Sequence, residues 1–129
     1  MKQRITVEQL QELSEEQGGR LREWWRPVAG DYFTALFSGT PLNRVISNVS
    51  KRYEGQIRDS HCNVWEIADC LPLLSIGQCI ELGYFLGIHA DLTIPLYQDK
   101  DYPLTWYPGR KEEPIEIIDA LWGAIKTRI

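Results

Sequence analysis

The sequence predicts an α+β fold: a small, mostly antiparallel sheet packed by two helices, with a helical N-terminal arm. Apolar residues recur at helical spacing near both ends and in the middle of the chain, and β-favouring runs lie between these segments. The chain has 129 residues, 43% of them hydrophobic, which is enough to bury one core. We therefore expect a single domain, with the arm over residues 1–27 and a sandwich-like α/β core over residues 30–129.

Two short helices are expected in the arm. Each begins with a capping-box pattern, in which a hydroxyl side chain is followed three positions later by glutamine: Thr6 with Gln9, and Ser14 with Gln17. The pair Gly18-Gly19 interrupts the second helix and costs about 1 kcal/mol per glycine relative to alanine. We expect this helix either to kink there or to begin later than its cap, and to be stopped by Pro27.

The segment from residue 30 to residue 70 favours strands. An aromatic run predicts the first strand over residues 32–37, and ragged apolar patterns predict two more over residues 45–49 and 64–68. Further on, residues 92–96 and 104–106 alternate in polarity and predict a hairpin. Pro95 and Pro103 place its strands at an edge or near their ends, because proline has no amide donor.

Two longer helices are expected in the second half. A third capping box, Ser75 with Gln78, opens an apolar helix over residues 76–86 that we expect to be buried on much of its circumference. Pro114 suits the first position of a last helix over residues 115–128, which we expect to dock on a sheet.

The formal net charge is −4, so the chain as a whole lacks the basic field that draws a protein to nucleic acid. Residues 20–58 are nevertheless locally basic. Their cations are Arg20, Arg22, Arg26, Arg44, Lys51, Arg52 and Arg58. This stretch is interpreted either as a solvated surface or as a patch that contacts phosphates.

A cytoplasmic location is expected. The three cysteines, Cys62, Cys70 and Cys79, are odd in number and not closely spaced, which favours free thiols in a reducing compartment. The first residues lack the apolar stretch of a secretory signal. The most apolar segment, residues 71–88, contains Glu81, which a bilayer would bury at a cost of about 3 kcal/mol. We expect no membrane partner.

Chemical motifs are sparse. His61 and Cys62 are adjacent, and Cys70, Cys79 and His89 follow at irregular spacings without the close ligand pairs that zinc sites use. No nucleophile elbow, phosphate loop or dinucleotide-binding glycine pattern occurs. The sequence therefore predicts no catalytic residue, no metal, no cofactor and no enzyme. An enzyme without a recognisable signature is the second alternative.

Trp24 and Trp25 are the most distinctive pair among five tryptophans. Neighbouring residues on a helix diverge by about 100°, so both rings cannot face inward unless the helix is wedged between two layers. An exposed ring beside arginines has the composition of an interface hot spot, and it could also stack on a nucleic-acid base. The candidate interaction surface comprises Arg20, Arg22, Trp24, Trp25 and Arg26.

Three segments carry a resemblance to a known group: LSEEQGGRLREWWRPVAGDYF, DCLPLLSIGQCIELG and IEIIDALWGAIK. They resemble small proteins of unassigned function from phages and prophages of Gram-positive (Firmicute) bacteria. The resemblance implies an intracellular, phage-associated accessory role, and no catalytic or binding residue carries over from it.

We therefore expect a non-catalytic protein-interaction module that binds a protein of the host or the phage. The alternative is a nucleic-acid-binding accessory protein that uses residues 20–58. A homodimer, formed through an edge strand or through the tryptophan pair, is left open.

Overall fold

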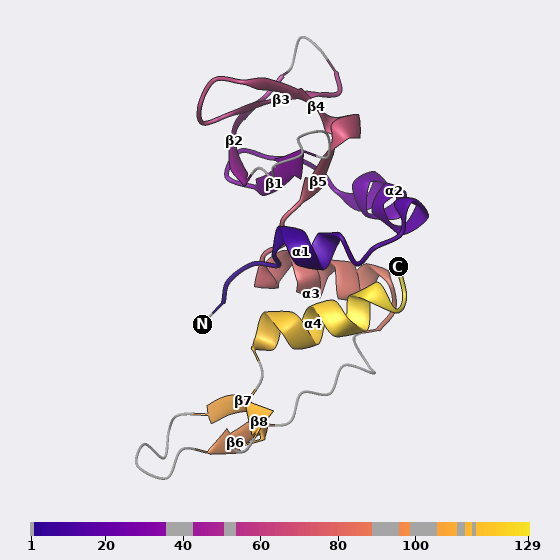
Figure 1. Cartoon of the computed structure of the whole chain (residues 1–129), viewed down its shortest axis with the longest axis vertical. Helices are drawn as coiled ribbons and strands as arrows, with labels where there is room; N and C mark the ends of the chain where they lie inside the picture. The colour runs from indigo at the N-terminus through magenta and orange to yellow at the C-terminus, as the bar shows by residue number, and fades with distance from the viewer. Residues whose placement is uncertain are drawn as a thin grey trace. The chain divides into compact units, whose positions relative to one another are not determined.

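The computed structural model describes residues 2–35, 43–50, 54–88, 96–98, 106–110, 113–114 and 116–129. Within these ranges four α-helices accompany a five-stranded antiparallel sheet and a smaller three-stranded one, which confirms the predicted α+β class (Figure 1). The chain forms two compact units, Thr6–Leu74 and Met1–Ile5 with Ser75–Ile129. The single domain over residues 1–129 stays a prediction.

The unit Thr6–Leu74 begins with α1 (Val7–Leu10) and α2 (Glu15–Trp24). Both predicted capping boxes are present. Thr6 and Ser14 each accept from the amide of the third following residue at 3.2 Å, and Gln9 and Gln17 reach back to the cap amides at 2.9 Å. Of the two alternatives expected for α2, the one in which the helix begins later than its cap is wrong. Gly18 is buried beside Leu71 of the sheet, and this packing explains how the glycine pair is tolerated in the helix.

The five-stranded sheet has the order β4-β3-β2-β1-β5, and every neighbouring pair is antiparallel. Its strands are β1 (Tyr32–Ala35), β2 (Arg44–Val49), β3 (Gln56–Asp59), β4 (Val64–Glu66) and β5 (Cys70–Pro72). The first strand was expected to reach residue 37, and residues 36 and 37 lie outside the described residues. Residues 67 and 68, expected in the third strand, belong instead to a 3₁₀ turn, Ile67–Asp69.

Two strands of this sheet were missed from the sequence, β3 and β5. β3 has the sequence QIRD, in which only Ile57 is apolar, and β5 is three residues long and ends in proline. Pro72 is tolerated because β5 is an edge strand, where a missing amide breaks no inner ladder. One buried cluster lies under this sheet and comprises Trp25, Phe33, Ile46, Ile57 and Cys70.

The second unit is built on α3 (Ile76–Phe85) and α4 (Ile117–Lys126), which pack against each other. The third predicted capping box is present, with Ser75 Oγ accepting from Gln78 N at 3.2 Å. Gly87, at φ +73°, ends α3: its amide donates to Tyr84 O, and the amide of Ile88 donates to Gly83 O. These two bonds form a Schellman motif.

The first residues of the chain bind to this second unit. Arg4 forms a β-bridge with Ser75, and the backbone amide of Lys2 donates to Glu116 Oε2 at 3.1 Å. The Lys2 ammonium pairs with Asp119 on α4. Among the described residues, none of the helices has the length and apolar character needed to cross a bilayer.

A three-stranded antiparallel sheet, in the order β6-β7-β8, completes this unit. It comprises β6 (Leu96–Gln98), β7 (Trp106–Arg110) and β8 (Glu113–Pro114). The pairing of β6 with β7 confirms the predicted hairpin at residues 96 and 106, whereas residues 92–95 and 103–105 lie outside the described residues. The placement of Pro114 in the last helix is wrong. Pro114 pairs with Gly109 in β8, and α4 begins three residues later, at Ile117.

Candidate functional site

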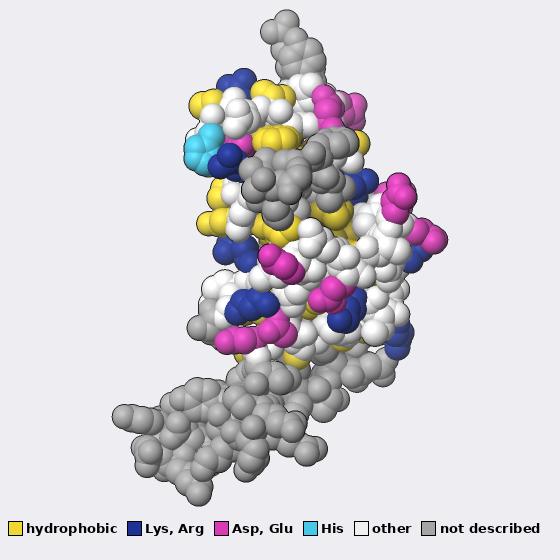
Figure 2. All heavy atoms as spheres, viewed as in Figure 1, with side chains coloured by type: hydrophobic (Ala, Val, Ile, Leu, Met, Phe, Trp, Pro, Cys, Tyr) yellow, Lys and Arg dark blue, Asp and Glu magenta, His cyan; other side chains and the backbone are white. Residues whose placement is uncertain are grey.

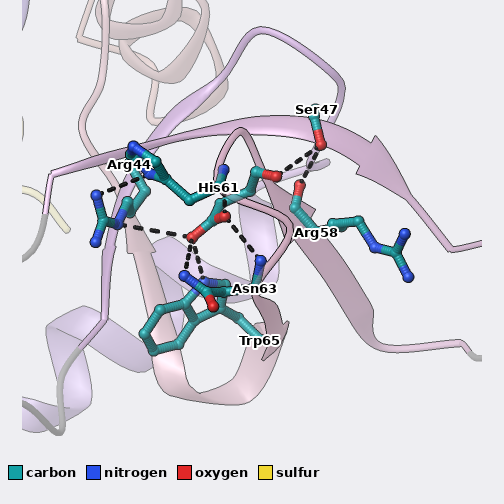
Figure 3. A network of polar contacts seen from close by, with 7 residues as sticks. Arg44, Ser47, Arg58, His61, Asn63 and Trp65 are labelled. Carbon is teal, nitrogen blue, oxygen red and sulfur yellow. Dashed lines mark hydrogen bonds and ion pairs between the residues drawn. The ribbon is translucent and has the colours of Figure 1, made fainter.

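The turn between β3 and β4 holds a fully buried carboxylate, Asp59 (Figure 3). Asp59 accepts hydrogen bonds from the amides of His61 at 2.8 Å and Asn63 at 3.0 Å, and from the Trp65 indole at 2.9 Å. Asn63 Nδ2 adds a longer bond of 3.4 Å. Burial by itself would raise the pKa of Asp59, but these hydrogen bonds outweigh it and hold the pKa below its usual value. Asp59 therefore stays ionised at neutral pH, unlike a general acid, and its bonds hold the turn together.

Arg44 on β2 joins this network from the neighbouring strand. Its Nε lies 3.6 Å from Asp59 Oδ2, and its Nη1 lies 2.9 Å from His61 Nδ1. Arginine can only donate, so His61 Nδ1 is the acceptor and carries no proton in this geometry. This contact engages only the Nδ1 nitrogen of His61.

The predicted Arg–Trp surface is divided by the structure. Trp25 is 3% exposed and lies in the core cluster, and Trp24 is half-buried and packs against that same cluster. Both rings reach the core because the chain leaves the helix at Trp25, which has an extended backbone (φ −65°, ψ 130°). The 100° divergence between helical neighbours therefore does not apply to this pair.

The arginines of that surface are engaged within the chain. Arg20 pairs with Glu16 at 2.8 Å, and Arg26 donates to the carbonyl of Glu23 at 3.1 Å. Arg22 is half-buried, and its Nε donates to the carbonyl of Cys70 at 3.0 Å. On the face drawn in Figure 2, basic side chains lie among acidic ones and do not gather in a stripe. Lys51 and Arg52, of the locally basic segment, lie outside the described residues.

The three thiols differ in accessibility. Cys62 is exposed at the tip of the β3–β4 turn, at φ +65°, whereas Cys70 and Cys79 are buried. Burial raises the pKa of Cys79 to about 12. Burial, with the nearby Asp69 charge, also raises the pKa of Cys70 to about 12 despite the opposing charge of Arg22. Among the described residues, no three His, Cys, Asp or Glu side chains gather in a metal-binding group. His89 lies outside the described residues.

Among the residues of the second unit whose burial is described, the largest exposed apolar side chains belong to α3. Ile80 is 45% exposed, Tyr84 63% and Phe85 70%. We call these three residues the α3 aromatic face. The expectation that this helix is buried on much of its circumference is wrong, because its buried arc holds only Cys79, Leu82 and Gly83.

A groove of about 170 Å³ borders this face, between α3 and α4. It is lined by Cys79, Ile80, Gly83, Tyr84, Ile88, Leu121 and Ile125. Gly83 contributes no side chain, and a Cβ at this position would lie 3.6 Å from Ile88 Cγ1. The sequence signal that could have found the site is the apolar content of α3 beyond one helical stripe, since positions 80, 84 and 85 lie off the arc of Cys79, Leu82 and Gly83.

Comparison of the chain with models of known protein families, with curated proteins and with solved structures finds no significant match, so the geometry described above is the basis for the function proposed next.

Proposed function

We propose that this chain is a non-catalytic protein-interaction module, an accessory protein of a phage or prophage. We further propose that it binds an amphipathic helix of a protein partner on the α3 aromatic face. The observation that carries the proposal is the exposure of Ile80, Tyr84 and Phe85 on one short helix. Tyrosine and phenylalanine are enriched at protein interfaces, where their rigid rings bury large areas at low entropic cost.

The size of the α3–α4 groove supports a helical partner with one anchoring side chain. Its volume is about 170 Å³. An apolar cavity of about 150 Å³ accommodates benzene in another protein, so this groove suits one aromatic or large aliphatic side chain. Amphipathic helices bind such grooves with apolar anchors spaced three and four residues apart. The anchor would enter between Ile80 and Tyr84, which line the groove, while Phe85 lies about 100° further round α3 than Tyr84 and would contact the partner beside the groove.

The charge on α3 adds a second feature that the partner should match. Glu81 is exposed beside the α3 aromatic face and is the one charged residue of α3. A lysine or arginine next to the anchor would offset this carboxylate, and an acidic residue there would be disfavoured. The partner expected is therefore a basic amphipathic helix.

Site-specific photo-crosslinking tests this docking surface. The photoreactive residue p-benzoylphenylalanine is placed at position 85, or at Val28, which is 55% exposed in the other unit and serves as a control. Both variants are irradiated in a lysate of the bacterium that encodes the chain, and the crosslinked peptides are sequenced. We expect a segment with apolar anchors at helical spacing and flanking basic residues, joined to position 85 and not to position 28.

A synthetic peptide of that segment then provides the quantitative test by calorimetry. Tyr84→Ala and Phe85→Ala should each weaken binding about 10-fold or more, and Val28→Ala should leave it unchanged. Crosslinks only between two copies of this chain would replace the proposal with a homodimer. Equal labelling from positions 85 and 28 would exclude the docking surface.

The phage association rests on the resemblance of the three segments quoted above and has its own test. The encoding bacterium is treated with mitomycin C to induce its prophages, and protein levels are followed by mass spectrometry. We expect this chain to rise in parallel with virion structural proteins. A constant level while those proteins rise would contradict the association without affecting the docking surface.

A further inference from the structure

A second concave site lies within the unit Thr6–Leu74, and none of the residues used above for docking lines it. It is a cleft of about 450 Å³ where α1 and α2 border β1, β5 and Ala68. Ligand pockets of small molecules span about 300–1,000 Å³ and are mostly apolar, with a few polar groups that orient the ligand. Here the apolar lining comprises Val7, Leu10, Leu13, Ala35, Ala68 and Leu71.

Arg22 supplies the cleft with a cation that the sheet holds in place. Its Nε donates to the carbonyl of Cys70 at 3.0 Å, which orients the guanidinium while its terminal amino groups remain able to donate. Among the described residues, no acidic side chain lies within ion-pairing distance of Arg22. Gln11, Ser14 and Thr34 add uncharged polar groups to the lining. A half-buried guanidinium without a carboxylate partner, in such a partly apolar cleft, favours an anionic ligand, because arginine matches the two oxygens of a carboxylate.

Glu15 places the opposite charge on the same cleft. Glu15 and Arg22 are seven residues apart on α2, which corresponds to two turns and about 10 Å along the helix axis. Gly18 lies between them on α2 and lines the cleft beside Leu71. The middle of a ligand that extends along α2 from Arg22 would therefore contact Leu10, Leu13 and Leu71. Its far end would approach the negative charge of Glu15.

From this arrangement we infer that the cleft binds a small aliphatic monocarboxylate, with the carboxylate on Arg22 and the hydrocarbon chain along α2. The apolar lining selects a hydrocarbon tail, and Arg22 selects an acid over an alcohol. Glu15 disfavours a second carboxylate at the other end, since two like charges would face each other there. The inference does not depend on the α3 aromatic face.

Titration of the full chain with octanoate, followed by amide NMR and calorimetry, tests the inference. We expect saturable binding with shifts at residues lining the cleft. Octanol and the dicarboxylate suberate, of equal chain length, should each bind at least 10-fold more weakly than octanoate. Equal binding of octanol and octanoate would overturn the role of Arg22, and no saturable binding of octanoate would overturn the site.

Variants on α2 separate the contributions of the two charges. Arg22→Gln should weaken octanoate at least 10-fold, whereas Arg20→Gln, at an exposed position outside the cleft, should leave it unchanged. Because Arg22→Gln also removes a bond to the sheet, Glu15→Gln is the independent test. The Glu15→Gln variant should raise the affinity for suberate about 10-fold while changing the affinity for octanoate less than two-fold. An unchanged preference for octanoate over suberate would contradict the proposed orientation.

The same titration is repeated with a peptide that ends in a leucine carboxylate. If this peptide binds 10-fold more tightly than octanoate, the ligand is a protein C-terminus and not a small acid.

Discussion

The indole nitrogen of Trp25 donates to Asp31 Oδ2 at 3.0 Å, and the same oxygen accepts from the amide of Val28 at 3.2 Å. One carboxylate thus joins the ring of a core residue to the turn that leads into β1. The bond satisfies the only polar atom of a side chain that is 3% exposed. Trp25, which the sequence offered either as a core residue or as part of an interface, therefore helps to hold helix and sheet together.

Replacing the two neighbouring tryptophans should have unequal effects on stability. Trp25→Ala should lower the free energy of unfolding by about 3–5 kcal/mol, because it empties a large buried site. Trp24→Ala should cost about 1–2 kcal/mol, since that ring is only half-buried. Urea denaturation followed by circular dichroism measures both. A Trp24→Ala variant less stable than Trp25→Ala would contradict the assignment of Trp25 to the core.

Asp59 should make the free energy of unfolding of the unit Thr6–Leu74 depend on pH in the acidic range. The pKa of Asp59 is lower in the folded chain than its usual value of 3.8. Asp59 thus binds a proton less readily in the folded state than in the unfolded state. The stabilisation that ionised Asp59 contributes is therefore present above its pKa in the unfolded state, and it is lost as the pH falls through its pKa in the folded state. Asp59→Asn should lower stability at pH 7 by about 3 kcal/mol and reduce the loss of stability below about pH 4.

The control for Asp59 is Asp119→Asn, which changes an exposed carboxylate of α4 that pairs with Lys2. This variant should change stability at pH 7 by less than about 1 kcal/mol. Urea denaturation at a series of pH values compares the two variants with the unmodified chain. Equal acid sensitivity of the unmodified chain and Asp59→Asn would show that other groups govern the acid response.

The three thiols should differ in their rates of alkylation. Only thiolates react readily, and burial raises the pKa of Cys70 and Cys79 to about 12. Cys62 is exposed and should be labelled by iodoacetamide at pH 8 within minutes, with the other two labelled only in denaturant. Peptide mass spectrometry over a time course identifies each site. Early labelling of Cys79 would indicate that α3 and α4 separate readily.

Replacing a glycine by alanine should have opposite effects on stability at Gly19, inside a helix, and at Gly87, at the end of a helix. Gly19 lies inside α2 with open space around its missing side chain, so Gly19→Ala should stabilise the chain by about 0.5–1 kcal/mol. Gly87 has φ +73° at the end of α3, and Gly87→Ala should destabilise the chain by about 1 kcal/mol. Thermal melting of the pair measures the difference. A stabilising Gly87→Ala would contradict the Schellman end of α3.

The starts of α1, α2 and α3 were predictable from sequence because their causes are local. Thr6, Ser14 and Ser75 each satisfy an amide three residues further on, and this bond depends on neighbours in the chain alone. The α+β class followed from the same local patterns. The start of α4 was predicted wrongly because its cause is not local. Pro114 suits a helix start by its local sequence, but its pairing with Gly109 places it in a strand.

The candidate sites could not be found in this way, because each one joins segments that are distant in sequence. Arg22 lies in a cleft with Leu71, and its orientation depends on the carbonyl of Cys70, 48 residues away. The α3–α4 groove depends on Leu121 and Ile125 meeting α3. The sequence signalled the apolar excess of α3, but which of its side chains stayed uncovered was not a local property.

By itself, the sequence determined the caps of three helices, the fold class and the first strand, since hydrogen bonds and polarity patterns over a few residues decide these features. Tertiary structure alone decided that Trp25 is core, that Asp59 is a buried anion and that Phe85 faces solvent. Burial is a property of the whole packed chain, because a side chain is removed from water only by residues that folding brings to it.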